Sequence, residues 1–236
     1  MTAEFVHLRV HTEYSLVDGL VRIDRLMTQT ASAGMPAVAM TDHVNLFGLV
    51  KFYQAAHKAG IKPIVGVDLL LDQGEGETPA RFTLLCLNAE GYRNLTRLIS
   101  RAYIEGQGRG RPLVQREWVA EAATGLLALS GAREGDIGRA LLAGRSGLAE
   151  QHTSFWQQHF PERFYIELQR TGRPGEEDYL HAAVELAGRM DLPVVATNDV
   201  RFLAAGDFDA HEVRVCINSG RTLADPRRPR DYSPQQ

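Results

Sequence analysis

Short apolar strands and amphipathic helices alternate along almost the whole chain, and this alternation constrains the fold more than any other feature. Residues 5–10 alternate in hydrophobicity and predict a first strand. Ile23, Leu26, Met27 and Thr30 then recur at helical spacing before Gly34, which predicts an amphipathic helix with a glycine stop. Further predicted strands are 37–40, 64–71, 82–87, 125–129, 164–168 and 192–196, and further predicted helices are 46–60, 92–103, 137–142, 180–187 and 208–217.

A strand followed by a helix, repeated, predicts right-handed crossovers and a parallel sheet. About seven strands in a chain of 236 residues favour a closed or nearly closed barrel over an open sheet. The predicted class is therefore α/β. No internal repeat is visible beyond the strand–helix rhythm.

Composition excludes several classes of protein. The 26 Lys and Arg against 29 Asp and Glu give a net charge of −3, so bulk charge does not attract nucleic acid or a membrane. No apolar run approaches the length of a membrane helix, and residues 1–4 do not begin a signal peptide. The only two cysteines, Cys86 and Cys216, lie in apolar runs, which is typical of buried thiols in a reducing compartment. We therefore expect a cytoplasmic protein.

Three stretches look irregular. Residues 72–80 and 105–112 are rich in glycine and charge and predict solvated loops, with Arg109 and Arg111 in the second. Residues 221–236 carry four arginines and three prolines and predict an extended basic linker. We therefore expect a domain over residues 1–220 and a linker over residues 221–236 that leads to something longer.

Polar side chains gather where the predicted strands end. In a parallel barrel these ends share one rim, so the side chains are expected to converge. Carboxylates and imidazoles on one rim are typical of a multinuclear metal centre, whereas the alternative is that they are helix caps and turn residues. The set is Arg9, His11, Asp18, Asp42, His43, Asp68, Arg81, Asn198, Asp199 and Arg201.

Five sequence motifs of this chain resemble those of the polymerase-and-histidinol-phosphatase (PHP) domain. More narrowly, they resemble the PHP domains found at the N-terminus of bacterial replicative DNA polymerase III alpha subunits. The resemblance covers nearly the whole chain, and it implies a distorted (β/α)7 barrel of the PHP type. The polymerase palm is not among these residues. The motifs are FVHLRVHTEYSLVDG, MTDHVNLFG, GIKPIVGVD, NAEGYRNL and VVATNDVRF.

The resemblance also implies a set of metal ligands, which this sequence keeps only in part. His11, Asp18, His43 and Asp199 match the pattern, and Asp68 stands where the family has a glutamate. Three arginines depart from it by standing where the family has histidines. These three are Arg9, Arg81 and Arg201. Two further positions match the pattern less closely: Ala132 stands where the family has a cysteine, and Thr171 where it has another histidine.

Arginine cannot ligate a cation, because the guanidinium has no free lone pair near neutral pH. Three arginines therefore remove three donors and add three charges, which can pair with Asp18, Asp68 and Asp199 instead. We interpret the cluster as a vestigial metal site refilled by ion pairs, with no cofactor and no catalytic residue. One weak divalent ion on His11, His43 and a carboxylate is the alternative left open.

Three functions compete at this point. The resemblance implies a non-catalytic domain that stabilises the rest of the polymerase III alpha subunit and docks the proofreading exonuclease (epsilon) subunit. Metal-competent relatives imply a metal-dependent phosphoesterase or 3′–5′ exonuclease. The third reading is a nucleic-acid-binding module using Arg109, Arg111 or the arginines of residues 221–230, but so few phosphate contacts would bind weakly. We expect little direct DNA binding and no membrane partner.

Overall fold

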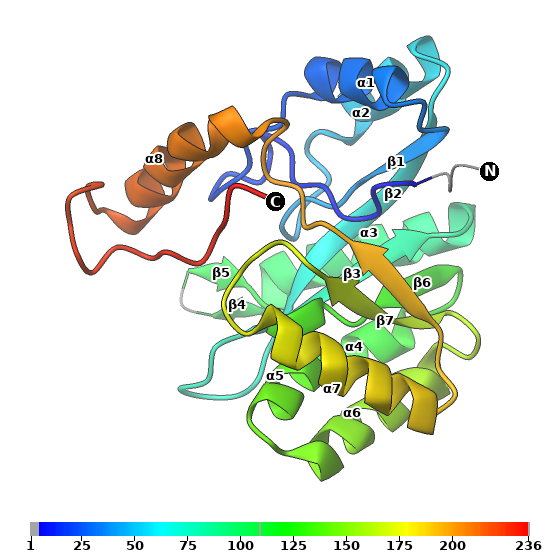
Figure 1. Cartoon of the computed structure of the whole chain (residues 1–236). Helices are drawn as coiled ribbons and strands as arrows, with labels where there is room; N and C mark the ends of the chain where they lie inside the picture. Colours follow the sequence, from blue (N-terminus) through cyan, green and yellow to red (C-terminus); the bar gives the residue numbers. More distant parts are fainter. Residues whose placement is uncertain (1–4, 109, 236) are drawn as a thin grey trace. The chain divides into compact units, whose positions relative to one another are not determined.

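The computed structural model describes residues 5–108 and 110–235, and its backbone divides into two compact units. The first unit comprises Met1–Val65, Thr171–Arg173 and Asn198–Gln236. The second unit comprises Gly66–Arg170 and Pro174–Thr197. Strand β2 (Lys62–Leu71) belongs to both, because the division falls within it (Figure 1).

In the first unit, strand β1 (Ala37–Met40) pairs in parallel with the first four residues of β2. Helix α1 (Ile23–Ser32) buries the four residues expected from the sequence, and Gly34 follows it with φ of 67°. A left-handed φ of this kind favours glycine, so the predicted helix and its stop are confirmed. The core that this helix helps to form contains Val10, Val21, Ile23, Leu26, Met27, Val38, Met40, Phe52, Ala56, Ile61 and Val200.

The predicted strand over residues 5–10 is not a regular strand. Only Val10 forms a ladder bridge, and it is parallel to Val200. Its neighbours still bond on both sides, because the Ala39 amide donates to the His7 carbonyl at 2.8 Å and the Val200 amide donates to the Arg9 carbonyl at 3.1 Å. The segment is thus extended and bonded in the first unit, but its bonds are too irregular for a continuous ladder.

The helical spacing of Leu46, Leu49, Val50, Tyr53 and Ala56 predicts a helix with these side chains on its apolar face. Helix α2 (Leu49–Lys58) is present, but part of that expected face was wrong. Phe52 and Ala56 are buried, whereas Val50 is 70% exposed and Tyr53 is 50% exposed. Apolar spacing predicted the helix correctly, but it could not tell which of two adjacent apolar stripes faces the core. The last helix of this unit is α8 (Phe208–Ser219), as predicted.

The second unit contains the remaining strands, and its sheet is mixed. The last six residues of β2 pair antiparallel with β3, and β3 pairs antiparallel with β6; only β6 with β7 and β7 with β8 are parallel. The prediction of a parallel sheet was therefore wrong at β3, because β2 and β3 are joined by a loop without a crossover helix. These strands are β3 (Ala80–Cys86), β6 (Leu126–Leu129), β7 (Phe164–Gln169) and β8 (Val194–Thr197).

Aromatic residues fill the core of this unit. The Phe82 ring lies 4.1 Å from the Trp156 ring and 6.4 Å from the Phe164 ring, measured between centroids. Two of the helices, α4 and α6, were not predicted from the sequence. The helices of the unit are α3 (Ala89–Glu105), α4 (Arg116–Glu121), α5 (Asp136–Leu142), α6 (Ser146–His159) and α7 (Glu176–Arg189).

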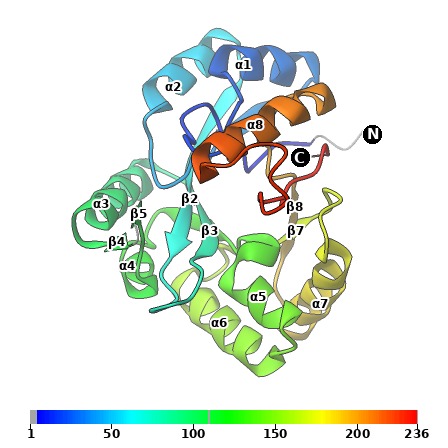
Figure 2. The ribbon, with the colours of Figure 1, turned by 90° about the vertical axis from the view of Figure 1, so that its left-hand side faces the viewer.

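The three irregular stretches turn out differently. Most of residues 72–80 form a loop, as expected. Residues 105–112 contain the end of α3 and a short hairpin of β4 (Gln107–Gly108) and β5 (Arg111–Pro112), so the loop prediction was wrong there; Arg109 lies outside the described residues. The described residues 221–235 form no helix or strand and follow α8 in the first unit (Figure 2). The domain boundary at residue 220 stays a prediction.

Candidate functional site

A tight turn directly after Val10 carries the first two site residues. The Ser15 amide donates to the Thr12 carbonyl at 2.9 Å, and the Gly19 amide donates to the Ser15 carbonyl at 2.8 Å. A Cβ atom at Gly19 would lie 1.8 Å from the Thr12 oxygen, so only glycine allows this close approach. The turn thereby fixes His11 at its start and Asp18 near its end.

Asp42, two residues after the end of β1, holds this turn in place. Its carboxylate accepts hydrogen bonds from the Thr12 amide at 2.6 Å, the Thr12 hydroxyl at 2.7 Å and the Ser15 hydroxyl at 2.7 Å. Burial raises the pKa of Asp42, and these hydrogen bonds oppose that shift in part. Asp42 is therefore a structural residue that orders the turn.

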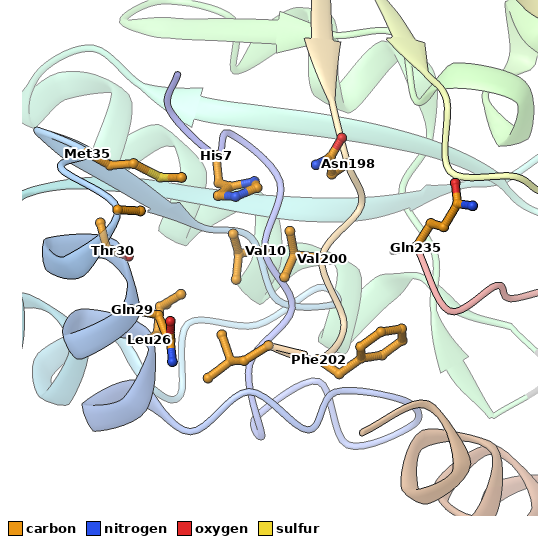
Figure 3. Close-up of a pocket in the computed structure, with 12 residues that line it drawn as sticks. His7, Val10, Leu26, Gln29, Thr30, Met35, Asn198, Val200, Phe202 and Gln235 are labelled. Carbon is orange, nitrogen blue, oxygen red and sulfur yellow. The ribbon is translucent and has the colours of Figure 1, made fainter. Parts of the chain in front are cut away.

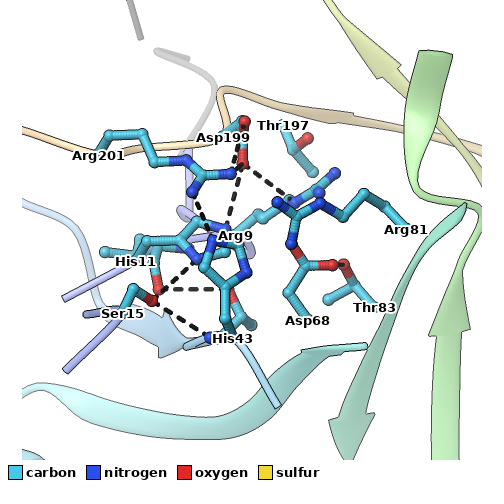
Figure 4. A network of polar contacts seen from close by, with 12 residues as sticks. Arg9, His11, Ser15, His43, Asp68, Arg81, Thr83, Thr197, Asp199 and Arg201 are labelled. Carbon is cyan, nitrogen blue, oxygen red and sulfur yellow. Dashed lines mark hydrogen bonds and ion pairs between the residues drawn. The ribbon is translucent and has the colours of Figure 1, made fainter. Parts of the chain in front are cut away.

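Asp199 is the centre of the ionic cluster in the first unit. It has a left-handed backbone with φ of 50°, which is uncommon for a residue other than glycine but tolerated by aspartate. Its carboxylate lies 3.2 Å from Arg9 Nε and 3.2 Å from His11 Nε2 (Figure 4). Arg201 Nη2 lies 3.0 Å away and Arg173 Nη1 lies 3.6 Å away.

Asp18 is the second carboxylate of this cluster and is paired in the same way. Arg201 donates to it, so one guanidinium joins the two carboxylates. His43 Nε2 lies 3.1 Å from Asp18 and 2.8 Å from Arg201 Nη1. The centroids of the His11 and His43 rings are 4.3 Å apart.

The electrostatics of the cluster follow from these contacts. Burial by itself raises the pKa of both carboxylates, Asp18 and Asp199. The charge of Arg201 lowers both pKa values, helped by His43 at Asp18 and by Arg9 at Asp199. The net result is that both pKa values lie well below the ordinary aspartate range. Burial and the Arg201 charge lower the pKa of His11 to about 3, so His11 is neutral near pH 7. Both carboxylates are therefore ionised and both are paired.

Two of the expected site residues, Asp68 and Arg81, lie in the second unit. Arg81 Nη1 lies 3.4 Å from Asp68, and the Thr83 hydroxyl donates to the same carboxylate at 3.4 Å. Thr83 is the register partner of Asp68 in the β2–β3 pair. The backbone of Gly131, with φ of 77°, approaches the same strand so closely that a Cβ would lie 2.1 Å from the Arg81 carbonyl oxygen.

The residues of the first-unit cluster do not fit a multinuclear metal centre. The carboxylates that would ligate a cation, Asp18 and Asp199, already accept guanidinium groups. Three guanidinium groups surround two carboxylates there, and the buried His11 brings no negative charge. A dication would therefore have to displace paired arginines and would meet positive charge when it arrived.

Two members of this cluster were missed by sequence reasoning. Arg173, which pairs with Asp199, follows β7 in a loop. Tyr232, whose hydroxyl donates to Asp18 at 2.7 Å, lies in the segment interpreted as a linker. Neither position carried a signal, because neither comes directly after a predicted strand or matches the expected ligand pattern. The two positions that matched the family's ligand pattern less closely are both occupied in other ways. Ala132 is buried with φ of 49°, and the Thr171 carbonyl accepts a hydrogen bond from Ser233.

A separate pocket of about 280 Å³ lies beside α1 in the first unit (Figure 3). Val10, Leu26 and Phe202 are among its apolar lining residues. Asn198, which the sequence grouped with the rim, lines this pocket, as does Gln235. No contact of Asn198 with the ionic cluster is present among the described hydrogen bonds and ion pairs.

The strand order, the ionic turn after Val10 and the Thr-Asp-His phrase after β1 define a class of protein. The model of the PHP domain family matches residues 7–171, and the chain belongs to this family. Its fold class is the one expected, α/β with a distorted (β/α) barrel of the PHP type.

Within that family, the chain is similar to a particular group of polymerase subunits. It is 59% identical over 237 residues to the DNA polymerase III subunit alpha of Pseudomonas aeruginosa, and 56% identical over 233 residues to that of Escherichia coli K12. The alignments cover 100% and 98% of this chain but 20% of each relative, so the chain spans about one fifth of the length of these curated relatives. The matched part is their N-terminal region.

Solved structures of low sequence identity share the fold. A protein assigned as a metal-dependent phosphoesterase, from Bifidobacterium adolescentis, has a TM-score of 0.57 at 13% identity and covers 85% of this chain and 88% of its own. An amidohydrolase from Chromobacterium violaceum has a TM-score of 0.56 at 16% identity, with 89% and 96% covered. In the part of this chain that the structure describes, no helix is long and apolar enough to span a membrane.

Proposed function

We propose that this chain is the PHP region of a DNA polymerase III alpha subunit, and that it hydrolyses no phosphoester itself. The observation that carries the second statement is the pairing of Arg9, Arg173 and Arg201 with the carboxylates of the first-unit cluster. Arginine at these places cannot activate a water through a metal, because it supplies charge without a lone pair. The cluster is a vestigial metal site that now holds loops together.

Measurement of bound metal together with phosphatase activity tests this. The purified chain is incubated with Zn²⁺ and Mn²⁺, its metal content is measured after desalting, and hydrolysis of p-nitrophenyl phosphate is followed. We expect less than stoichiometric metal and no hydrolysis above a blank. Stoichiometric metal, together with hydrolysis that a chelator abolishes, would overturn the proposal.

A gain-of-function variant sharpens the same test. Changing Arg9→His and Arg201→His returns two imidazole donors and removes two charges, so divalent-metal affinity should rise. The matched control is Arg170→His, because Arg170 forms an exposed ion pair with Glu177 outside the cluster. If the folded double variant binds no more Zn²⁺ than the control, the cluster is not a former metal site.

In the polymerase, the role of the domain is to stabilise the polymerase part and to dock the proofreading exonuclease subunit. The similarity to polymerase alpha subunits supports the first role, and the second rests on what is typical of that family. Calorimetry of this chain with the purified exonuclease subunit of the same replisome tests docking. We expect a complex at micromolar concentration, and no heat at tens of micromolar would remove this role.

The chain alone should also lack polymerase activity. Primer extension by the purified chain is expected to give no incorporation, since the polymerase palm, which would hold the two metal ions of nucleotidyl transfer, is not among these residues. A metal-dependent phosphoesterase or exonuclease is the second candidate, favoured by the fold shared with the Bifidobacterium protein. The metal and phosphatase measurements decide between the two.

A further inference from the structure

We propose that residues 228–235, the strap, are held in a socket of the first unit that recognises the side chain of Tyr232. The socket consists of Asp18, Arg173, Arg201 and His211, so the same arginines and aspartate that pair in the ionic cluster also bind this segment. The predicted basic linker would then be a docked element and not a free one.

The contacts of Tyr232 carry this inference. Its hydroxyl donates to Asp18 at 2.7 Å, and its ring meets the His211 ring edge to face at 4.5 Å between centroids. The guanidinium carbons of Arg173 and Arg201 lie 5.5 Å and 5.6 Å from the centre of the Tyr232 ring. Both values are within the range of cation–π attraction, so the ring is bound by two cations and its hydroxyl by an anion.

The chemistry of the socket selects tyrosine over other side chains. Asp18 is fixed by Arg201 and is ionised, which makes it a strong acceptor for a phenol. Phenylalanine would keep the two cation–π contacts but would leave Asp18 without this donor. An aliphatic side chain would lose the cation–π contacts as well.

Neighbouring residues hold the strap on both sides of Tyr232. Arg228 forms an ion pair with Glu212 of α8, and the buried Ser233 donates its hydroxyl to the Thr171 carbonyl. The Gln235 amide donates to the Ser233 hydroxyl at 3.1 Å, and the Gln235 side chain lines the pocket beside α1 (Figure 3). The strap is therefore anchored at several points within the first unit.

One consequence rests on the proposed function. The chain matches the N-terminal fifth of its polymerase relatives. In such a polymerase, a docked strap would determine the position on the first unit from which the next part of the polymerase continues. The refilled cluster then has a use that metal binding would have prevented, because a metal would compete with Tyr232 for Asp18.

Limited proteolysis of the full 236-residue chain tests the strap. Trypsin can cleave after the exposed Arg230, whereas Pro229 protects the bond after Arg228. Cleavage after Arg230 requires the strap to leave its socket, so its rate at low protease reports the released population. We expect Tyr232→Leu to raise this rate about tenfold or more, and Tyr232→Phe to raise it less.

Two controls keep the result specific. Cleavage after the exposed Arg145, between α5 and α6 of the second unit, is measured in the same digest and should not change. Tyr103→Leu, at an exposed tyrosine of α3, should leave cleavage after Arg230 as in the natural chain. A Tyr232→Leu rate within about twofold of the Tyr103→Leu rate overturns the proposal.

Should circular dichroism show that Tyr232→Leu does not fold, the Tyr232→Phe variant decides instead, and an unchanged cleavage rate after Arg230 in that variant overturns the proposal. Neither outcome depends on metal content or phosphatase activity, so this test and that of the proposed function fail separately.

Discussion

Arg201 is the residue on which the first-unit cluster depends most. It is fully buried, it bridges Asp18 and Asp199, and the two carboxylates hold its pKa above the ordinary arginine value against the opposing effect of burial. A buried ion pair gives little net stability over an apolar pair, but removal of one partner leaves a buried charge, which is costly. The cluster is therefore more vulnerable to single substitutions than to coordinated ones.

Replacing Arg201→Gln should lower the free energy of unfolding by about 3–5 kcal/mol, because two buried carboxylates lose their shared cation. Urea unfolding measures this. The matched control is Arg170→Gln, whose ion pair with Glu177 is exposed and should leave the urea midpoint unchanged. A midpoint for Arg201→Gln equal to that of the control would mean that the ion pairs are not formed in solution.

The neutral, buried His11 makes stability depend on pH. Its pKa is about 3 in the folded chain against an ordinary value of 6.5, so the unfolded state takes up a proton first as pH falls. The stability that depends on neutral His11 is fully present above pH 6.5. It is lost progressively as the pH falls from 6.5 to 3, where the free energy of unfolding changes by up to about 1.4 kcal/mol per pH unit. Asp18 and Asp199, with lowered pKa values, add a further loss only below about pH 4.

Urea unfolding at several pH values between 7.5 and 4.5 checks this. His11→Gln should reduce the slope of the free energy of unfolding against pH by up to about 1.4 kcal/mol per pH unit, the effect of one proton, whereas Gln54→Ala, at an exposed position of α2 without a titratable side chain, should leave the slope as it is. Equal slopes for the natural chain and His11→Gln would contradict the buried neutral state of His11.

At the scale of elements, close backbone approaches matter as much as side chains. Gly131 precedes a short 3₁₀ turn, Ala132–Glu134, with a left-handed φ of 77°. In contrast, Gly147 lies in the first turn of α6 and a Cβ there would meet nothing within 4 Å. Of these two glycines of the second unit, Gly147 has room for a larger side chain, whereas Gly131 does not.

Gly131→Ala should destabilise the chain by at least about 1–2 kcal/mol, since the left-handed conformation alone costs that much and the added Cβ would also meet the Arg81 carbonyl. Gly147→Ala should stabilise it slightly, by about 0.5–1 kcal/mol. Thermal and urea unfolding of the pair measure both. A Gly131→Ala variant as stable as Gly147→Ala would disprove the close approach.

At the scale of the whole molecule, β2 is the strand that both units share. Its first four residues pair with β1, and its last six pair with β3. Neither unit can lose its sheet without affecting this strand. We therefore expect the chain to unfold in one cooperative transition.

Two probes test that cooperativity. Trp118 and Trp156, the only tryptophans of the sequence, both lie in the second unit, so tryptophan fluorescence reports that unit. Hydrogen exchange of α1 reports the first. Coincident urea midpoints support one transition, and midpoints separated by more than the fitting error would mean that the units unfold independently.

Most of the helices and strands, and the site residues that follow strands, could be predicted from the amino-acid sequence. Periodicity predicted α1, α2, α8 and most strands, because local hydrophobic spacing follows from which face is buried. The identity of Arg9 and Arg201 already excluded them as metal ligands, since that is a property of the guanidinium itself.

The remaining features depend on tertiary contacts, which the local spacing of apolar residues does not encode. The antiparallel direction of β3, the irregular bonding of residues 5–10 and the exposed face at Val50 all depend on partners distant in sequence. The same holds for Arg173 and Tyr232, which join Asp18 and Asp199 only through the folded backbone. A sequence pattern reports which groups are available, whereas pairing energies depend on distances of a few ångströms, and those distances are set only when the chain folds.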